Sequence, residues 1–135
     1  SDPCAQRSLD MARDYAIERY AFGRQIGSYQ AIKHRLADMY VKVEMARSNC
    51  FFGAWALTSS ADDIAEAAAV SRIGAVDAFA YAAQENVQIH GGIGFTWEAD
   101  PHLLLKRMKL QEALLGGGGV WKEKLYKVLS SKQAA

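Results

Sequence analysis

Apolar residues recur every three or four positions through most of the chain, a spacing that places them on one face of an α-helix. The pattern predicts helices over about Gln6–Tyr20, Tyr29–Thr58, Ser60–His90, Pro101–Leu115 and Val120–Ser131. One face of the second helix carries apolar residues at Ile32, Leu36, Met39, Val43, Ala46 and Cys50. No stretch alternates apolar and polar residues strictly enough to predict a β-strand, so the pattern indicates an all-α protein.

Turn and capping residues mark the ends of the predicted helices. Ser28 is suited to cap the N-terminus of the second helix, and residues 60–63 resemble a capping box at the start of the third. Asp100 is expected to cap the fourth helix, with Pro101 at its first position, and the four glycines at 116–119 are expected to end it.

Composition supports the same fold class. Alanine accounts for 23 residues and the chain has only two prolines, so backbone propensity favours helix. Gly53 lies inside the long second helix, where we expect a close contact with another helix rather than a break. We therefore predict an up-down four-helix bundle with a short extra C-terminal helix, forming one domain over residues 1–135. The first helix is too short to cover its partners' apolar faces, so we expect a fragment of a longer chain or an obligate oligomer.

Charge and residue usage exclude several classes of protein. Lys and Arg total 16 and Asp and Glu total 15, so the net charge of +1 indicates neither a nucleic-acid nor an anionic-membrane partner. No apolar run approaches the roughly 20 residues that span a bilayer, and the first residues lack a signal-peptide pattern. The two cysteines form no disulfide framework, and no His or Cys spacing indicates a metal site. We expect a cytoplasmic protein without a metal centre.

The turn between the first two helices could bind a phosphate. Arg19 and Arg24 surround a tight loop that contains Gly23 and Gly27 and precedes a helix N-terminus. The planar fork of arginine and the free N–H groups of a helix N-terminus both suit an anion. An ordinary helix-loop-helix turn with solvated arginines is the alternative interpretation.

A second unusual stretch, residues 88–96, follows the third helix. Three of its glycines occupy positions 91, 92 and 94, where the absence of a Cβ lets backbone N–H groups approach a ligand. The stretch is not the fingerprint of a dinucleotide-binding βαβ unit, because it follows a helix rather than a strand. A glycine-rich helix C-terminus without a ligand is the alternative.

Together these two segments resemble the acyl-CoA dehydrogenase family. The resemblance is carried by residues 15–26, by Gln30 and residues 36–39, and by residues 88–96 with Glu98. The blocks have the order and separation found in the C-terminal helical domain of that family. The resemblance covers almost all of this chain, but only that one domain of a full-length member.

The resemblance implies a flavoprotein oxidoreductase of lipid metabolism. Family members bind FAD and desaturate acyl-CoA thioesters between the α and β carbons, with hydride transfer to the flavin. Electrons then usually pass to an electron-transfer flavoprotein. The enzymes are commonly oligomers of identical or related subunits, so we expect a homo- or hetero-oligomer, and we expect the isolated domain to be inactive.

The resemblance also assigns cofactor-binding residues. Arg19 matches the arginine that meets the FAD phosphates, Phe22 matches a residue that lines the same site, and Gln30 matches a flavin-contacting glutamine. The segment that receives FAD from a neighbouring subunit is matched by Gln88, Ile89, His90, Gly91 and Gly92. The assignment requires the two turns to come together, within one chain or across a symmetric assembly.

The catalytic position departs from the family pattern. Some relatives end the fourth helix with a Tyr-Glu-Gly-Thr pattern whose glutamate is the base, and this chain has Leu115 at that position. Leucine cannot accept a proton. Glu112 is expected to be a solvated helix residue, and the base that other members carry on the first helix would precede Ser1. The chain therefore has no assigned catalytic residue, which leaves open a non-catalytic subunit or assembly module of a heteromeric acyl-CoA dehydrogenase.

Overall fold

The computed structural model describes residues 3–59 and 64–133. Within them the helices are α1 (Pro3–Glu18), α2 (Gln30–Ser59), α3 (Ile64–His90), α4 (Pro101–Leu115) and α5 (Gly118–Gln133). Two short strands, β1 (Tyr20–Ala21) and β2 (Arg24–Gln25), pair antiparallel between α1 and α2. Short 3-10 helices follow at Ile26–Ser28 and at Gly91–Phe95.

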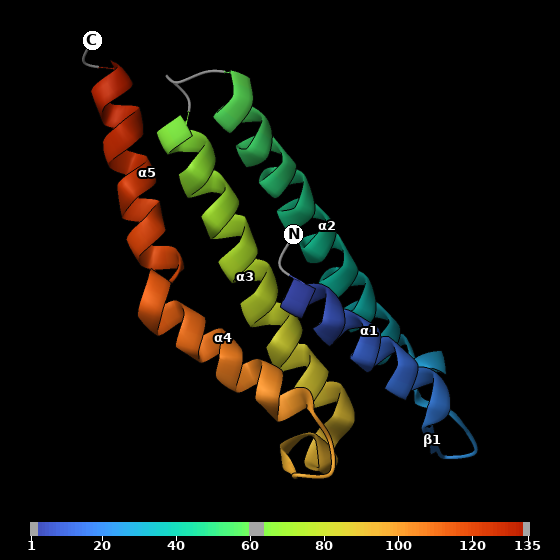
Figure 1. Ribbon diagram of the computed structural model, residues 1–135. Helices are drawn as coiled ribbons and strands as arrows, with labels where there is room; N and C mark the ends of the chain where they lie inside the picture. The colour runs from blue at the N-terminus through green and yellow to red at the C-terminus, as the bar shows by residue number, and fades with distance from the viewer. Residues whose placement is uncertain (1–2, 60–63, 134–135) are drawn as a thin grey trace.

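Helix α3 is the central element of the bundle. It packs against each of the other four α-helices, with α2 and α1 on one side and the successive helices α4 and α5 along the other (Figure 1). The long helices α2 and α3 run antiparallel, and α1 covers only part of their length (Figure 1). The predicted all-α four-helix bundle with an additional C-terminal helix is confirmed.

Small residues let the helices approach closely around a few large side chains. The fully buried large apolar residues are Phe79, Met39, Met108 and Val43. Gly53 of α2 faces Ser71 of α3, and a Cβ at Gly74 of α3 would lie 2.6 Å from Nδ2 of Asn49. The close helix contact predicted at Gly53 is confirmed, because a Cβ there would clash with the Ser71 hydroxyl and would lie 3.7 Å from the Ala67 carbonyl oxygen of α3.

The connection between α1 and α2 is a tight loop as predicted, but it contains strands that were not predicted. Helix α1 ends at Glu18 instead of Tyr20, and β1 and β2 form a hairpin that the sequence pattern did not predict. Its two central residues, Phe22 and Gly23, have φ angles of 52° and 81°, as a two-residue hairpin turn requires. Strands of two residues are too short for a period to emerge, so alternation could not reveal them.

The predicted helix ends are correct in part. Ser28 does not cap α2, because it lies in a 3-10 helix and its Oγ donates to the Gln25 carbonyl at 2.6 Å. Asp100 occupies the N-cap position of α4 without a side-chain cap hydrogen bond, and Pro101 begins that helix as predicted. The capping box at residues 60–63 lies outside the described residues.

The glycine run separates α4 from α5 only at its beginning. Helix α4 ends at Leu115 as predicted, and Gly116 has a φ of 82°, in the left-handed region that breaks a helix. Helix α5 begins at Gly118, two residues earlier than the predicted Val120, so half of the glycine run is helical. No residue of α5 is buried, and the helix lies along the surface of α3.

Helix α2 presents an apolar surface that the described residues leave exposed. The exposed large apolar residues on α2 are Tyr40, Val41, Met45, Phe51, Phe52, Trp55 and Leu57. This surface agrees with the expectation that the bundle leaves apolar faces uncovered. In the stretches 3–59 and 64–133, no helix combines the length and apolar character needed to cross a membrane.

Candidate functional site

The two turns singled out in the sequence lie at the same end of the bundle. The hairpin after α1 and the glycine-rich turn after α3 are both found at the lower end in Figure 1. The rings of Tyr15 on α1 and His90 on α3 stack with their centroids 4.1 Å apart and an interplanar angle of 24°. One chain therefore brings the two turns together, as the predicted site requires.

Arg19 has a fixed backbone and an available side chain. Its N–H donates to the Tyr15 carbonyl at 2.9 Å, and its carbonyl accepts from the Ile26 N–H at 2.8 Å. The side chain is exposed and makes no hydrogen bond or ion pair with any residue in the described part of the chain. By contrast, Arg13 on the preceding helix α1 pairs with Asp14 at 2.8 Å. The guanidinium of Arg19 is thus available to an anion from outside the domain.

The hairpin holds its side chains in defined positions. The Tyr29 hydroxyl donates to the Ala21 carbonyl at 3.0 Å, and the Arg24 guanidinium lies 3.8 Å from the centre of the Tyr29 ring. Phe22, at the tip, has a left-handed backbone conformation, which costs a residue with a Cβ about 1–2 kcal/mol. Its side chain is 98% exposed. Gln30, the first residue of α2, is also exposed next to this hairpin. Phe22 and Gln30 are accessible to a ligand.

The glycine-rich turn presents backbone instead of side chains. Gly91 has a φ of 63°, and neither Gly91 nor Gly92 has an atom within 4 Å of the position that a Cβ would occupy. Gln88 is exposed beside them, whereas Ile89 is only 6% exposed and belongs to the core. A ligand can therefore contact Gln88 and the two glycines directly, but can reach Ile89 only through its backbone.

His90 is half-buried and held in one tautomer. Its Nδ1 lies 2.8 Å from the Asn86 carbonyl. A carbonyl can only accept a hydrogen bond, so Nδ1 carries a proton and the second ring nitrogen has a free lone pair when the ring is neutral. Burial lowers the pKa of His90, and the hydrogen bond to Asn86 offsets part of that effect. The neutral ring is therefore favoured at the turn.

The protein is expected to lose stability on acidification through His90. Because folding lowers the pKa of this ring, the unfolded state takes up the proton first, near pH ~6.5. The contribution of the neutral His90 ring to the free energy of unfolding is complete above that pH, and it is lost as the pH falls through the pKa of His90 in the folded protein. The measurement is the unfolding midpoint of the intact protein between pH ~5 and ~8, compared with His90→Phe, in which the slope should be smaller. His34→Gln, an exposed change on α2, is the control and should keep the slope.

The expected catalytic position has no carboxylate. Leu115 is the last residue of α4 and is 58% exposed, and its carbonyl accepts a hydrogen bond from Nε1 of Trp121 at 2.9 Å. Glu112, one turn earlier, pairs with Lys109 at 3.2 Å on the same helix. Glu112 was predicted to be a solvated helix residue, and its side chain is 29% exposed.

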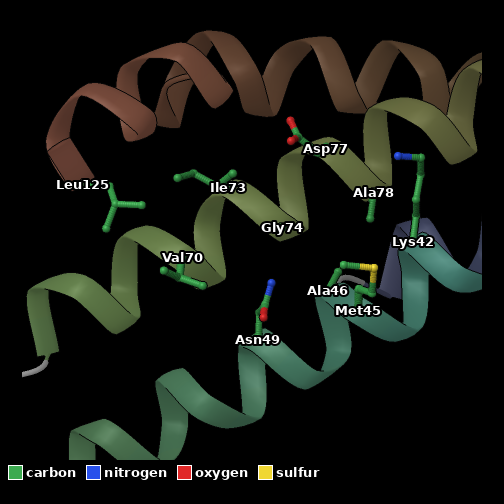
Figure 2. Close-up of a pocket in the computed structure, with 10 residues that line it drawn as sticks. All are labelled: Lys42, Met45, Ala46, Asn49, Val70, Ile73, Gly74, Asp77, Ala78 and Leu125. Atoms are coloured by element: carbon green, nitrogen blue, oxygen red, sulfur yellow. The ribbon is translucent and has the colours of Figure 1, made fainter.

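An apolar groove of about 310 Å³ lies away from both turns, between α2, α3 and α5. Figure 2 shows its lining residues, which are Lys42, Met45, Ala46, Asn49, Val70, Ile73, Gly74, Asp77, Ala78 and Leu125. No residue assigned to cofactor binding lines it, and Asp77 is paired with Lys122 at 3.7 Å. The candidate site is thus the exposed end of the bundle rather than this groove.

Sequence reasoning missed the residues that support the two turns. Tyr15 lies four residues before Arg19, and Asn86 lies four before His90, a spacing that places each pair on one helix face. Gly94 is buried, and a Cβ there would lie 2.8 Å from the Val87 carbonyl oxygen and 3.0 Å from the Cβ of His90. The helical spacing was visible in the sequence, but the need for glycine at position 94 was not.

The fold is that of a known class of protein. Residues 4–129 match the family described as acyl-CoA dehydrogenase, C-terminal domain, and the chain belongs to the acyl-CoA dehydrogenase family. The chain is 45% identical over 103 residues to acyl-CoA dehydrogenase IpdE2 of Mycobacterium tuberculosis. The aligned region is 76% of this chain and 30% of that protein. The IpdE2 protein of Mycolicibacterium smegmatis is 46% identical over 112 residues, covering 83% of this chain and 34% of that protein.

A solved structure shows the same bundle. A chain of the ChsE4–ChsE5 complex from Mycobacterium tuberculosis superposes with a TM-score of 0.88 at 31% identity, covering 94% of this chain and 34% of that one. The chain thus spans about a third of the length of these relatives. The predicted family and the assignment to its C-terminal helical domain are confirmed.

Proposed function

We propose that this chain is the C-terminal, FAD-contacting and oligomerisation domain of a cytoplasmic, FAD-dependent acyl-CoA dehydrogenase. The proposal rests mainly on one observation. Arg19, which has no side-chain partner among residues 3–59 and 64–133, and the open diglycine backbone at 91–92 lie at the same end of one chain, linked by the stack of Tyr15 on His90. A cation next to exposed amide groups is suited to the anionic bridge of a dinucleotide.

The residues at the two turns fit such a cofactor. Arg19 would bind the pyrophosphate, because its guanidinium has no competing ion pair in the described chain. At Gly91 and Gly92 no Cβ prevents the backbone from approaching the ligand. Phe22 would cover an apolar part of the cofactor, and the amide of Gln30 can both donate and accept hydrogen bonds.

Bound FAD would supply the acceptor for a hydride from the β carbon of an acyl-CoA thioester. This chain would hold and orient the cofactor, but neither Leu115 nor the paired Glu112 is placed to act as the base. The proton acceptor would come from another part of the protein or from a partner. We therefore expect the isolated 135 residues to show no dehydrogenation.

The exposed apolar face of α2 supports an oligomer. Tyr40, Phe51 and Trp55 share one side of this helix by their spacing, and each is more than half exposed. Large apolar patches on a folded surface mark contacts with other protein surfaces. We propose that the parent enzyme is a homo- or hetero-oligomer that takes acyl-CoA as substrate and passes electrons to an electron-transfer flavoprotein.

The test is the flavin content of the full-length parent protein. We expect the purified oligomer to carry FAD in about one copy per active site and to show the absorption spectrum of an oxidised flavin. Acyl-CoA should bleach that spectrum as the flavin is reduced. A folded full-length protein that binds no FAD, alone or with its natural partner, would contradict the proposal.

Leu115 favours a second candidate, a non-catalytic subunit of a heteromeric acyl-CoA dehydrogenase. The solved ChsE4–ChsE5 complex, which contains two differently named chains, is a relative of this chain. In such an assembly this subunit would provide part of the flavin site, and its partner would provide the base. Turnover of acyl-CoA by the unmodified homo-oligomer with an artificial electron acceptor would exclude this candidate.

A further inference from the structure

Tyr15 contacts both halves of the candidate site. Its ring stacks on His90 at a centroid distance of 4.1 Å, and its carbonyl accepts the N–H of Arg19 at 2.9 Å. Tyr15 therefore contacts the end of α3 through its side chain, and it contacts Arg19, just before the hairpin, through its backbone. A shift of the ring would move the last turn of α1, and Arg19 follows that turn directly.

His90 transmits the contact to the glycine-rich turn. Its Nδ1–H donates to the carbonyl of Asn86, a residue with no exposed surface, so the ring cannot rotate without losing a buried hydrogen bond. The turn then folds back over His90, because the position of a Cβ at Gly94 would be 3.0 Å from the Cβ of His90. His90 thus contacts Tyr15 through its ring, and its Cβ lies against the position of Gly94 in the turn that follows.

We propose that Tyr15 is a positioning residue. Through its stack on His90 it holds Arg19 and the hairpin in one fixed geometry relative to the glycine-rich turn, which carries the diglycine at 91–92. The inference rests on the proposed function, since it concerns how the same site binds its dinucleotide. The stack pre-organises two segments that are far apart in the sequence, so the cofactor meets both without having to order them first. The coupling is a property of this chain alone and precedes ligand binding.

The stack is not required to hold α1 in the bundle. Leu9, Ala12 and Ala16 anchor that helix in the core, and all three are buried. Loss of the Tyr15 ring should therefore leave the helix in place and loosen only its C-terminal turn. This separation between folding and positioning makes the proposal testable.

The experiment measures the affinity of the full-length apoprotein for FAD by quenching of flavin fluorescence, together with the unfolding midpoint of each variant. Tyr15→Leu removes the stack and is expected to weaken FAD binding about tenfold, the effect of losing one aromatic contact of ordinary strength. Tyr15→Phe keeps the ring and should restore an affinity within about twofold of the unchanged protein. Leu9→Ala is the matched control, because it removes a buried side chain from the same helix without touching either turn.

The double variant Tyr15→Leu with His90→Leu should bind FAD no more weakly than His90→Leu alone, since the stack is already lost in that variant. If Tyr15→Leu does not fold, Tyr15→Met, which also lacks the ring, is judged by the same criterion as Tyr15→Leu. Unchanged affinity in the Leu variants overturns the positioning role while leaving the proposed function intact. The positioning role is also overturned if Leu9→Ala weakens FAD binding as much as Tyr15→Leu does for the same fall in unfolding midpoint. An unchanged protein that binds no FAD overturns both the inference and the proposed function.

Discussion

Replacing Arg19 with alanine is expected to weaken FAD binding by the full-length protein about 10- to 100-fold, the loss typical of one charge-assisted hydrogen-bonding group. The backbone of this residue is held at both its N–H and its carbonyl, so the substitution should not disturb the hairpin. Its guanidinium has no partner within the described residues, so no ion pair of the domain is lost. The measurement is the dissociation constant of FAD from the apoprotein, taken at two salt concentrations.

The matched control for this variant is Arg13→Ala. Both residues are exposed arginines of the same region, but Arg13 is already paired with Asp10 and Asp14. Its removal should leave FAD affinity unchanged, and Arg19→Lys, which keeps the charge and loses the planar fork, should lie between the two. Equal affinities for Arg13→Ala and Arg19→Ala would show that the charge at position 19 does not meet the cofactor.

Gly94→Ala is expected to lower the free energy of unfolding of this domain by about 1–3 kcal/mol, because the added methyl group overpacks a rigid site. The Cβ would lie 2.8 Å from the Val87 carbonyl oxygen, which is backbone within α3 and cannot move without breaking the helix. It would also press on His90 and so displace the diglycine turn. The measurement is the thermal unfolding midpoint of the apoprotein, followed by its affinity for FAD, and both should fall.

Gly92→Ala is the paired comparison, and it should separate stability from binding. A Cβ at Gly92 meets no atom within 4 Å, and its φ lies outside the left-handed region, so the unfolding midpoint should not change. The methyl group would nevertheless project from the exposed backbone that we assign to cofactor binding. It would keep the cofactor away from that backbone, so FAD binding should weaken. A variant that binds FAD as the unchanged protein does would place the ligand elsewhere.

Local pattern was sufficient for the helices but not for their connections. The periodic apolar positions predicted α2 and α3 closely, since a long amphipathic helix repeats its signal over many turns. The hairpin at 20–25 gave no such repeat, and Ser28 bonds to Gln25 in a 3-10 helix instead of capping α2. Each of these details depends on how the chain packs against the end of α1.

The residue types in the sequence also identified the candidate site, but they revealed less about the residues that hold it in place. Arg19 and the open glycines could be singled out because a cation and a backbone without Cβ atoms are visible in the sequence. That Ile89 turns into the core while Gln88 stays exposed follows from the packing of α3, and the sequence assignment treated both alike.

The amino-acid sequence by itself determined an all-α chain, the position of its two unusual turns and its membership of the acyl-CoA dehydrogenase family, because each depends on residues close together along the chain. Only the tertiary structure decided that Tyr15 and His90 join the two turns and that no side chain fits at Gly94. These facts depend on contacts between helices that are distant in sequence, and such contacts are set by the packing of the whole bundle.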